Sequence, residues 1–210
     1  MVVQVDVISD VVCPLCWIGK RRLEKAIASL AQPVKVRWLP FQLNPAMPKE
    51  GISRKEYRTR KFGSWERSLE LDAQVAAAGK EDGIHFAFDK MERTPNIVDA
   101  HRLIWLADKQ GVQDSVVEAL FRAYFTEGRD IGKRNTLFDV VAEAGLDRDH
   151  TEVVLNNEQG QEAFREADEL GRRHRVDGVP FFIVNGKITL SGAQQPEAFL
   201  EAFRKAMTTT

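Results

Sequence analysis

Hydrophobic residues at the N-terminal end of the chain follow a strand, helix, strand pattern. Residues 2–8 are β-branched and almost continuously apolar, and residues 34–41, VKVRWLPF, alternate as a second strand does. Between them, apolar side chains recur on one face of a helix expected over residues 14–30, and basic side chains occupy much of the rest. These three elements predict one right-handed βαβ unit with parallel strands.

The middle of the chain, from about residue 53 to residue 174, carries helical periodicity and almost no strand signal. Ser53 and Glu56 have the spacing of a capping box, which predicts a long helix from there to about residue 78. Asn96 is expected to cap the next helix, which ends near Gly111. Further helices are expected over residues 113–126, 134–144, 148–156 and 158–174.

The C-terminal end returns to strands. FFIV and KITL flank Asn-Gly at 185–186, and Asn-Gly between two apolar runs predicts a type I′ hairpin. A last helix is expected over residues 196–207. Because strands flank a helical middle, the sequence predicts an α/β domain of residues 1–44 and 160–207, with an inserted helical domain of residues 45–159.

The composition is that of an ordinary globular protein without a large charge imbalance. The chain has 210 residues, of which 29% are charged and 43% hydrophobic, and its net charge is −1. No global field therefore attracts nucleic acid or an anionic membrane, and no apolar run approaches the ~20 residues of a membrane span. Two basic runs, at 54–61 and 172–175, are interrupted by acidic or apolar residues and are expected to be solvated helix faces.

The N-terminal residues do not have the pattern of a signal peptide, because they lack a basic segment and include Asp6 and Asp10. A cytoplasmic location is therefore expected. The reducing cytoplasm disfavours structural disulfides, so a close pair of cysteines there indicates redox chemistry or metal binding.

Such a pair exists: the two cysteines of the chain, Cys13 and Cys16, stand three residues apart at the expected junction of the first strand and the first helix. Side chains at i and i+3 on a first helical turn come within disulfide reach. The free amide groups and the dipole at the helix start favour a thiolate there. Cys13 is therefore expected to attack a disulfide, and Cys16 to resolve the mixed disulfide.

Three other interpretations of the pair are open. Both cysteines could be small core residues, or they could form half of a zinc site. The zinc site is disfavoured because there is no second cysteine pair and the four histidines lack the spacing of zinc ligands, so no metal site is predicted. A structural disulfide is disfavoured because it would close a very small loop.

Taken together, CPLCWIGK after the first strand and GVPFFIVNGKITLSGAQ near the C-terminus resemble the DsbA family of thioredoxin-fold oxidoreductases, and most closely its cytoplasmic FrnE-like branch. The resemblance extends to WLPFQLNP at 38–45, TPNIVDAHRLIWLA at 94–107 and LFRAYFTEGRDIG at 120–132. It implies a thioredoxin-like α/β fold with a large all-helical insertion. It also implies dithiol–disulfide exchange, with Cys13 and Cys16 as the redox pair.

The resemblance implies in addition a cis-proline at Pro180, facing the two thiols. A cis bond would turn the backbone of Val179 outward, where its amide and carbonyl could pair with an extended peptide. The alternative is an ordinary trans-proline at the start of a strand.

Four further residues are candidate substrate contacts: Pro14 inside the motif, Trp17 directly after it, Gln42 after the second strand and Gln194 after the last strand. Trp17 has two equal interpretations, since it could line the rim of a substrate groove or pack on the helix.

A related branch, the 2-hydroxychromene-2-carboxylate isomerases and kappa-class glutathione transferases, typically has serine where Cys13 stands and activates glutathione. Ala193 and Gln194 stand where kappa-type enzymes carry a Ser-Asp pair that holds glutathione. A glutathione-dependent isomerase or transferase of small aromatic electrophiles is therefore one alternative function, and a redox-inactive peptide-binding module is another.

The expected partner is a protein that contains a disulfide or a dithiol, or else a small thiol. No tightly bound cofactor is expected, glutathione is a candidate co-substrate, and a homodimer is open. The proton acceptor for Cys16 is open too. Thioredoxin carries a buried acid six residues before its first cysteine, where this chain has Val7. Asp6 would point to the opposite face of the strand, which leaves water or Asp10.

Overall fold

The computed structural model describes residues 2–208, and its centre is a mixed four-stranded sheet. The strand order is β2-β1-β5-β6, with β1 at Val3–Ser9, β2 at Val34–Pro40, β5 at Phe181–Val184 and β6 at Ile188–Ser191. β1 pairs with β2 in parallel and with β5 antiparallel, and β5 pairs with β6 antiparallel. The strands predicted at the two ends of the chain are thus confirmed, and they form one sheet.

Helices separate and follow these strands. They are α1 (Pro14–Ala28), α2 (Arg54–Phe62), α3 (Trp65–Glu81), the 3₁₀ helix η1 (Phe88–Lys90), α4 (Val98–Lys109), α5 (Gln113–Phe125), α6 (Arg134–Glu143), α7 (Arg148–Leu155), α8 (Gln161–His174) and α9 (Pro196–Thr208). A small second sheet pairs β3 (Ile52–Ser53) with β4 (Arg93–Thr94). Within residues 2–208, none of the helices has both the length and the apolar character that crossing a membrane requires.

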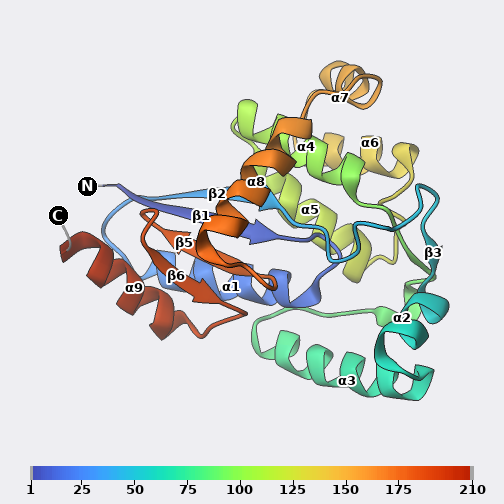
Figure 1. The fold of residues 1–210 in the computed structure, drawn as a ribbon, viewed down its shortest axis with the longest axis horizontal. Coiled ribbons are helices and arrows are strands. Elements are labelled where there is room, and N and C mark those ends of the chain that lie inside the picture. The colour runs from blue at the N-terminus through green and yellow to red at the C-terminus, as the bar shows by residue number, and fades with distance from the viewer. Residues whose placement is uncertain (1, 209–210) are drawn as a thin grey trace.

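The sheet lies between two helical layers: α1 and α9 cover one face and α8 covers the other (Figure 1). Alternation along β1 explains this arrangement. Val3, Val5 and Val7 are fully buried on the α1 side, whereas Ile8 packs with Ala167 of α8 on the other side. Asp6 also faces α8, where it pairs with Arg37, so its side chain is on the opposite side from α1.

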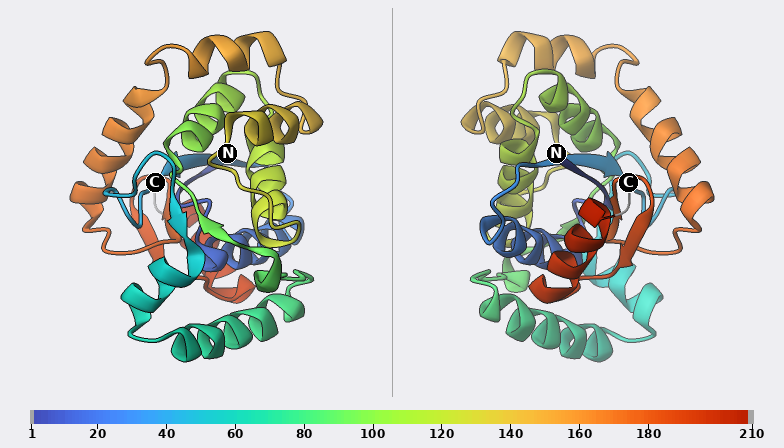
Figure 2. Two further views of the ribbon diagram at one scale, coloured as in Figure 1. Left: turned by 90° about the vertical axis from the view of Figure 1, so that its right-hand side faces the viewer. Right: turned by 90° about the vertical axis from the view of Figure 1, so that its left-hand side faces the viewer.

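The helices between β2 and β5 surround the sheet rather than form a separate lobe, with α3 at the bottom and α7 at the top of both views in Figure 2. Three of them, α4, α5 and α8, pack directly on β2. A single apolar cluster joins Val7 of β1 and Trp17 of α1 to Phe121 of α5 and Val140 of α6. The helical insertion therefore shares its core with the sheet.

The long helix predicted from residue 53 to about 78 is two helices. Gly63 ends α2 with φ +90°, a conformation that glycine adopts without a steric penalty. The Ser64 hydroxyl then accepts a hydrogen bond from the amide of Arg67 at 3.0 Å and starts α3. The expected cap at Ser53 is present, since its hydroxyl accepts from the amide of Glu56 at 3.5 Å.

Two other local features differ from the sequence prediction. The residue that caps α4 is Ile97, and Asn96 lies one position earlier, with its side-chain oxygen accepting from the amide of Val98 at 3.1 Å. β4 lies in residues 79–96, for which the sequence predicts a loop with at most a short extended piece, and its pairing with β3 is not predicted. Two-residue strands are too short to show a periodicity of two.

Candidate active site

The two cysteines lie on the first turn of α1. Cys13 caps the helix with extended dihedral angles (φ −97°, ψ 112°), and Pro14 follows at the first helical position, where no amide hydrogen is needed. The amide of Cys16 donates to the carbonyl of Cys13 at 3.0 Å. Both are free thiols; Cys13 is 6% exposed and Cys16 is fully buried.

Burial raises the pKa of the Cys16 thiol well above its ordinary value, and the hydrogen bond and the charge of Cys13 beside it raise this pKa further. Hydrogen bonds from the Ser9 side chain and the Asp10 backbone act in the opposite direction but are weaker. Cys16 therefore holds its proton at neutral pH, as expected of a resolving thiol that reacts only after the first step.

Cys13 faces the loop before β5. Its Sγ lies 3.7 Å from the carbonyl oxygen of Val179, and the peptide bond between Val179 and Pro180 is cis. Gly19 allows α1 to lie this close to the loop, because a Cβ added there would be 3.0 Å from both the Pro180 ring and the Phe182 ring.

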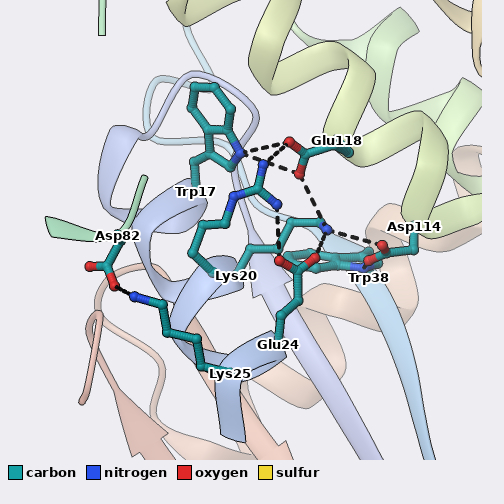
Figure 3. A network of polar contacts seen from close by, with 9 residues as sticks. Trp17, Lys20, Glu24, Lys25, Trp38, Asp82, Asp114 and Glu118 are labelled. Atoms are coloured by element: carbon teal, nitrogen blue, oxygen red, sulfur yellow. Dashed lines mark hydrogen bonds and ion pairs between the residues drawn. The ribbon is translucent and has the colours of Figure 1, made fainter. Parts of the chain in front are cut away.

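A polar network fastens α1 to α5 and β2 (Figure 3). Lys20, whose side chain is 2% exposed, contacts Glu24 on its own helix, Asp114 at 3.0 Å and Glu118 at 3.3 Å. Asp114 also accepts a hydrogen bond from the Trp38 indole of β2 at 3.1 Å. The helix that carries both cysteines is thereby fixed against the insertion and the sheet.

Trp17 belongs to the same contact region. Its indole nitrogen donates to Glu118 at 3.2 and 3.3 Å, and its ring lies against Phe86, Phe121 and Phe125. The side chain is 4% exposed and does not line the cavity at Cys13. Of the two interpretations of Trp17, the structure favours packing.

A cavity of about 340 Å³ opens beside Cys13. Cys13, Pro14 and Val179 line it together, so the structure brings three of the predicted site residues to one place. The opposite walls come from α2, α3, η1 with the residue after it, β4 and α5. Most of the side chains there are apolar or aromatic: Phe62, Leu71, Val75, Phe88, Met91, Tyr124 and Phe125.

Basic residues of α2 line this cavity as well, contrary to the prediction of a solvated helix face over residues 54–61. Arg54 is 3% exposed, Arg58 is half-buried, and both bind the carboxylate of Asp72, at 2.8 and 2.7 Å. Arg54, Arg58 and Lys61 stand at i, i+4 and i+7, a spacing that shares one helix face. That spacing is the one sequence signal that indicates the basic side of the cavity.

Asp10, a candidate proton acceptor for Cys16, is buried just before the motif. Its carboxylate accepts hydrogen bonds from the amides of Val12 at 3.0 Å and Leu43 at 2.8 Å, and its backbone carbonyl accepts from the amide of Cys13. Burial raises the pKa of the Asp10 carboxyl to about 6, against the smaller opposing effects of these amides and of Lys61.

Two predicted substrate contacts lie elsewhere. Gln42 lines a different cavity of about 560 Å³, between the segment after β2 and α8. Gln194 is exposed, and its side chain donates to the carbonyl of Ser191 at 2.6 Å. Gln42 follows the end of β2 on the α8 side of the sheet, and Gln194 turns back onto its own loop, so neither lines the cavity at Cys13. Within the described residues, no three His, Cys, Asp or Glu side chains are grouped so as to hold a metal ion.

Comparison with known proteins identifies the class. Residues 4–204 match the model of the DSBA-like thioredoxin domain, so the chain belongs to this family. It is 27% identical over 203 residues to the uncharacterized protein YwbO of Bacillus subtilis (strain 168), with 96% of each chain covered. The predicted DsbA family and the thioredoxin-like fold with a helical insertion are confirmed.

Two solved structures show the same architecture. The probable DsbA oxidoreductase SCO1869 from Streptomyces coelicolor superimposes with a TM-score of 0.91 at 27% identity, covering 99% of this chain and 91% of that one. The cytosolic disulfide reductase DsbM from Pseudomonas aeruginosa with GSH gives a TM-score of 0.68 at 20% identity, covering 96% of this chain and 99% of that one.

Proposed function

We propose that this protein is a thiol–disulfide oxidoreductase that acts through Cys13 and Cys16. One observation carries the proposal: both thiols are free on the first turn of α1, and Cys13 faces a cavity and the Val179 carbonyl while Cys16 is fully buried one turn deeper. An attacking sulfur with access to a ligand and a buried resolving sulfur are the two groups that disulfide exchange needs.

In the reducing direction, the Cys13 thiolate attacks one sulfur of a disulfide RS–SR, forms a mixed disulfide and expels RS⁻, which takes a proton from water. Cys16 then gives up its proton and attacks the Cys13 sulfur. The second RS⁻ leaves, and a disulfide forms between Cys13 and Cys16. The substrate gains two electrons and the protein loses two; the oxidising direction is the reverse.

Single serine substitutions test this sequence of steps. With bis(2-hydroxyethyl) disulfide, we expect Cys16→Ser to stop at a mixed disulfide on Cys13, visible by mass spectrometry, and Cys13→Ser to form none. Both variants should lose turnover by roughly a thousandfold or more, because the two thiols act as a unit. Equal turnover by both variants and the wild type would defeat the proposal.

Glutathione-dependent isomerisation or transfer is the second candidate. The similar fold of DsbM, determined with GSH, and the cationic residues in the Cys13 cavity favour it. In that mechanism bound glutathione is the nucleophile, so turnover of an aromatic electrophile should survive Cys16→Ser. A protein inactive in both assays, whose peptide binding is unaffected by both substitutions, would be a redox-inactive binding module instead.

We also propose that the protein acts in the cytoplasm, on the ground that DsbM is described as cytosolic. Cell fractionation with rapid alkylation of thiols tests this, and recovery of the protein with a Cys13–Cys16 disulfide in an exported fraction would contradict it. Placement in the FrnE-like branch and a homodimer stay predictions from the sequence.

A further inference from the structure

The Cys13 thiol faces a partly enclosed cavity rather than the open surface. Cys13 is 6% exposed, and its side chain lines the cavity of about 340 Å³ between α1 and α2. Leu15 is 42% exposed and Lys61 is exposed too, so these two lining side chains mark the mouth of the cavity. A cavity of this size holds a small molecule. To reach Cys13, a disulfide within a protein would have to enter this cavity together with the backbone on both sides of its cysteines.

The wall opposite Cys13 carries an excess of positive charge. Arg54, Arg58 and Lys61 line it, and Asp72 is the one acid among the described lining residues. The two arginines share that carboxylate. Lys61 forms no ion pair within residues 2–208, and its ammonium group donates to the Tyr57 hydroxyl at 3.3 Å. Burial lowers the pKa of Arg58, and repulsion from Arg54 lowers it further against the attraction of Asp72.

The buried carboxylate of Asp10, behind this wall, does not cancel the excess of positive charge. Both oxygens of the Asp10 carboxylate accept hydrogen bonds from backbone amides, and Asp10 does not itself line the cavity. When Asp10 and Asp72 are both counted, the three cations of α2 still exceed the acids. The rest of the lining is mainly apolar and aromatic, so an anionic group entering the cavity meets these cations beside a mostly apolar surface.

We propose, on the basis of the oxidoreductase function above, that the substrate is a small disulfide or thiol that carries a carboxylate. The carboxylate lies against Arg58 and Lys61 at one end of the cavity, and the sulfur lies at Cys13 at the other. Arg58 is half-buried and donates through Nε to the Ser68 hydroxyl and through Nη2 to Asp72, so Nη1 is the nitrogen that remains for a ligand carboxylate within the described residues. Lys61 at the mouth attracts the anion from solution.

The chemical step with such a disulfide is the exchange described above, and its electrons balance without a further reactant in a single turnover. Reduced protein and RS–SR give oxidised protein and two RSH. The bond between the two substrate sulfurs breaks and the bond between Cys13 and Cys16 forms. The two released RS⁻ groups take up one proton from water and the one proton that Cys16 gives up, and the proton from water equals the one that Cys13 lost on forming its thiolate.

The test uses fully reduced protein in single-turnover mixing with three small disulfides that differ mainly in charge. They are 3,3′-dithiodipropionate (anionic), bis(2-hydroxyethyl) disulfide (neutral) and cystamine (cationic). Each second-order rate is divided by the rate of the same probe with dithiothreitol, which removes differences in leaving-group reactivity. We expect the normalised rate for the anionic probe to exceed that for the neutral one roughly tenfold at low salt. High salt should reduce the ratio.

Variants of α2 then assign the preference to the cavity wall. Lys61→Gln should lower the anionic-to-neutral ratio about threefold, and Lys61→Arg should retain it. Arg60→Gln is the matched control on the same helix, because Arg60 points away from the cavity and pairs with Glu56 in solvent. It should leave the ratio unchanged.

The outcomes separate this inference from the function on which it rests. Equal normalised rates for the three probes would overturn the inference alone, and so would a ratio that Arg60→Gln lowers as much as Lys61→Gln does. Reduction of insulin as fast as that of the anionic probe would also overturn it. Failure of all three probes to oxidise the cysteine pair would overturn the oxidoreductase function itself.

Discussion

At the scale of single residues, Asp10 gives the clearest dependence of stability on pH. Its carboxyl pKa is raised from 3.8 to about 6 by burial, so the folded state favours the protonated form. The contribution of protonated Asp10 to the free energy of unfolding is complete below pH 3.8 and is lost as the pH rises through about 6. Asp10→Asn stays neutral, so its stability relative to the wild type should increase by about 3 kcal/mol between pH 3.5 and pH 7.

Urea unfolding at the two pH values measures this difference. The side chain that Asp10→Asn introduces has one acceptor oxygen fewer for the backbone amides of Val12 and Leu43. This loss lowers stability by about 1–3 kcal/mol at both pH values. The change between the two pH values is therefore the quantity to compare. Added salt should leave it intact, since Asp10 is 1% exposed. A difference that stays constant from pH 3.5 to pH 7 would contradict the assignment.

The sequence predicts the role of a residue where that role depends on its sequence neighbours. It does not predict the role where the contacting residues lie far along the chain. The three-residue spacing of Cys13 and Cys16 is visible in the sequence itself, and the structure places both at the start of α1 as expected. Trp17 was undecided because the phenyl rings that enclose it lie about 70 to 110 positions further along the chain. For the same reason, the sequence predicts a solvated Arg54, because its sequence neighbours do not reveal that Asp72 and the cavity face it.

At the scale of elements, the contact between α1 and α5 depends on Lys20. Lys20→Met would leave Asp114 without a cationic partner and would remove one of the two cations that bind Glu24 and Glu118, which both retain Arg21. Loss of a partner from a fully buried ion pair costs about 3–5 kcal/mol. These carboxylates are 28–61% exposed and can rehydrate, so we expect about 1–3 kcal/mol of lost stability.

Lys25→Met is the matched control for that measurement. Lys25 lies on the same helix and its ammonium group pairs with Asp82, but its side chain is 49% exposed and Asp82 retains Arg22 as a partner. Its removal should cost less than about 1 kcal/mol in urea unfolding. Equal losses for the two variants would show that the buried position of Lys20 has no special effect.

Element types were predictable wherever a periodic pattern was long enough. The strands at the ends and the helices α4 to α9 lie close to the expected ranges, because their apolar stripes run over several turns or alternations. The break at Gly63 was missed because apolar and polar residues continue in helical register on both sides of it. The break comes from one glycine with positive φ and one serine cap.

At the scale of the whole molecule, the order of strands and helices indicated an insertion, but nothing in the order indicated how the insertion lies. A helical segment between two strands could form a separate lobe or close over the sheet. The structure shows the second arrangement, because the buried face of α5 meets Trp17 and Trp38 rather than other insertion helices alone. Contacts between residues this far apart in the chain do not affect the local hydrophobic periodicity from which helices and strands are predicted.

This shared core predicts that the sheet and the insertion unfold together. Phe121 of the insertion and Phe182 of the sheet are both fully buried in one apolar cluster. We therefore expect one calorimetric transition whose enthalpy equals the van't Hoff value. Phe121→Ala and Phe182→Ala should each lower its midpoint, by roughly 6–15 °C. If Phe121→Ala instead produced an early transition and left a second one at the wild-type temperature, the insertion would be an independent unit and the cavity wall on α2 could move relative to Cys13.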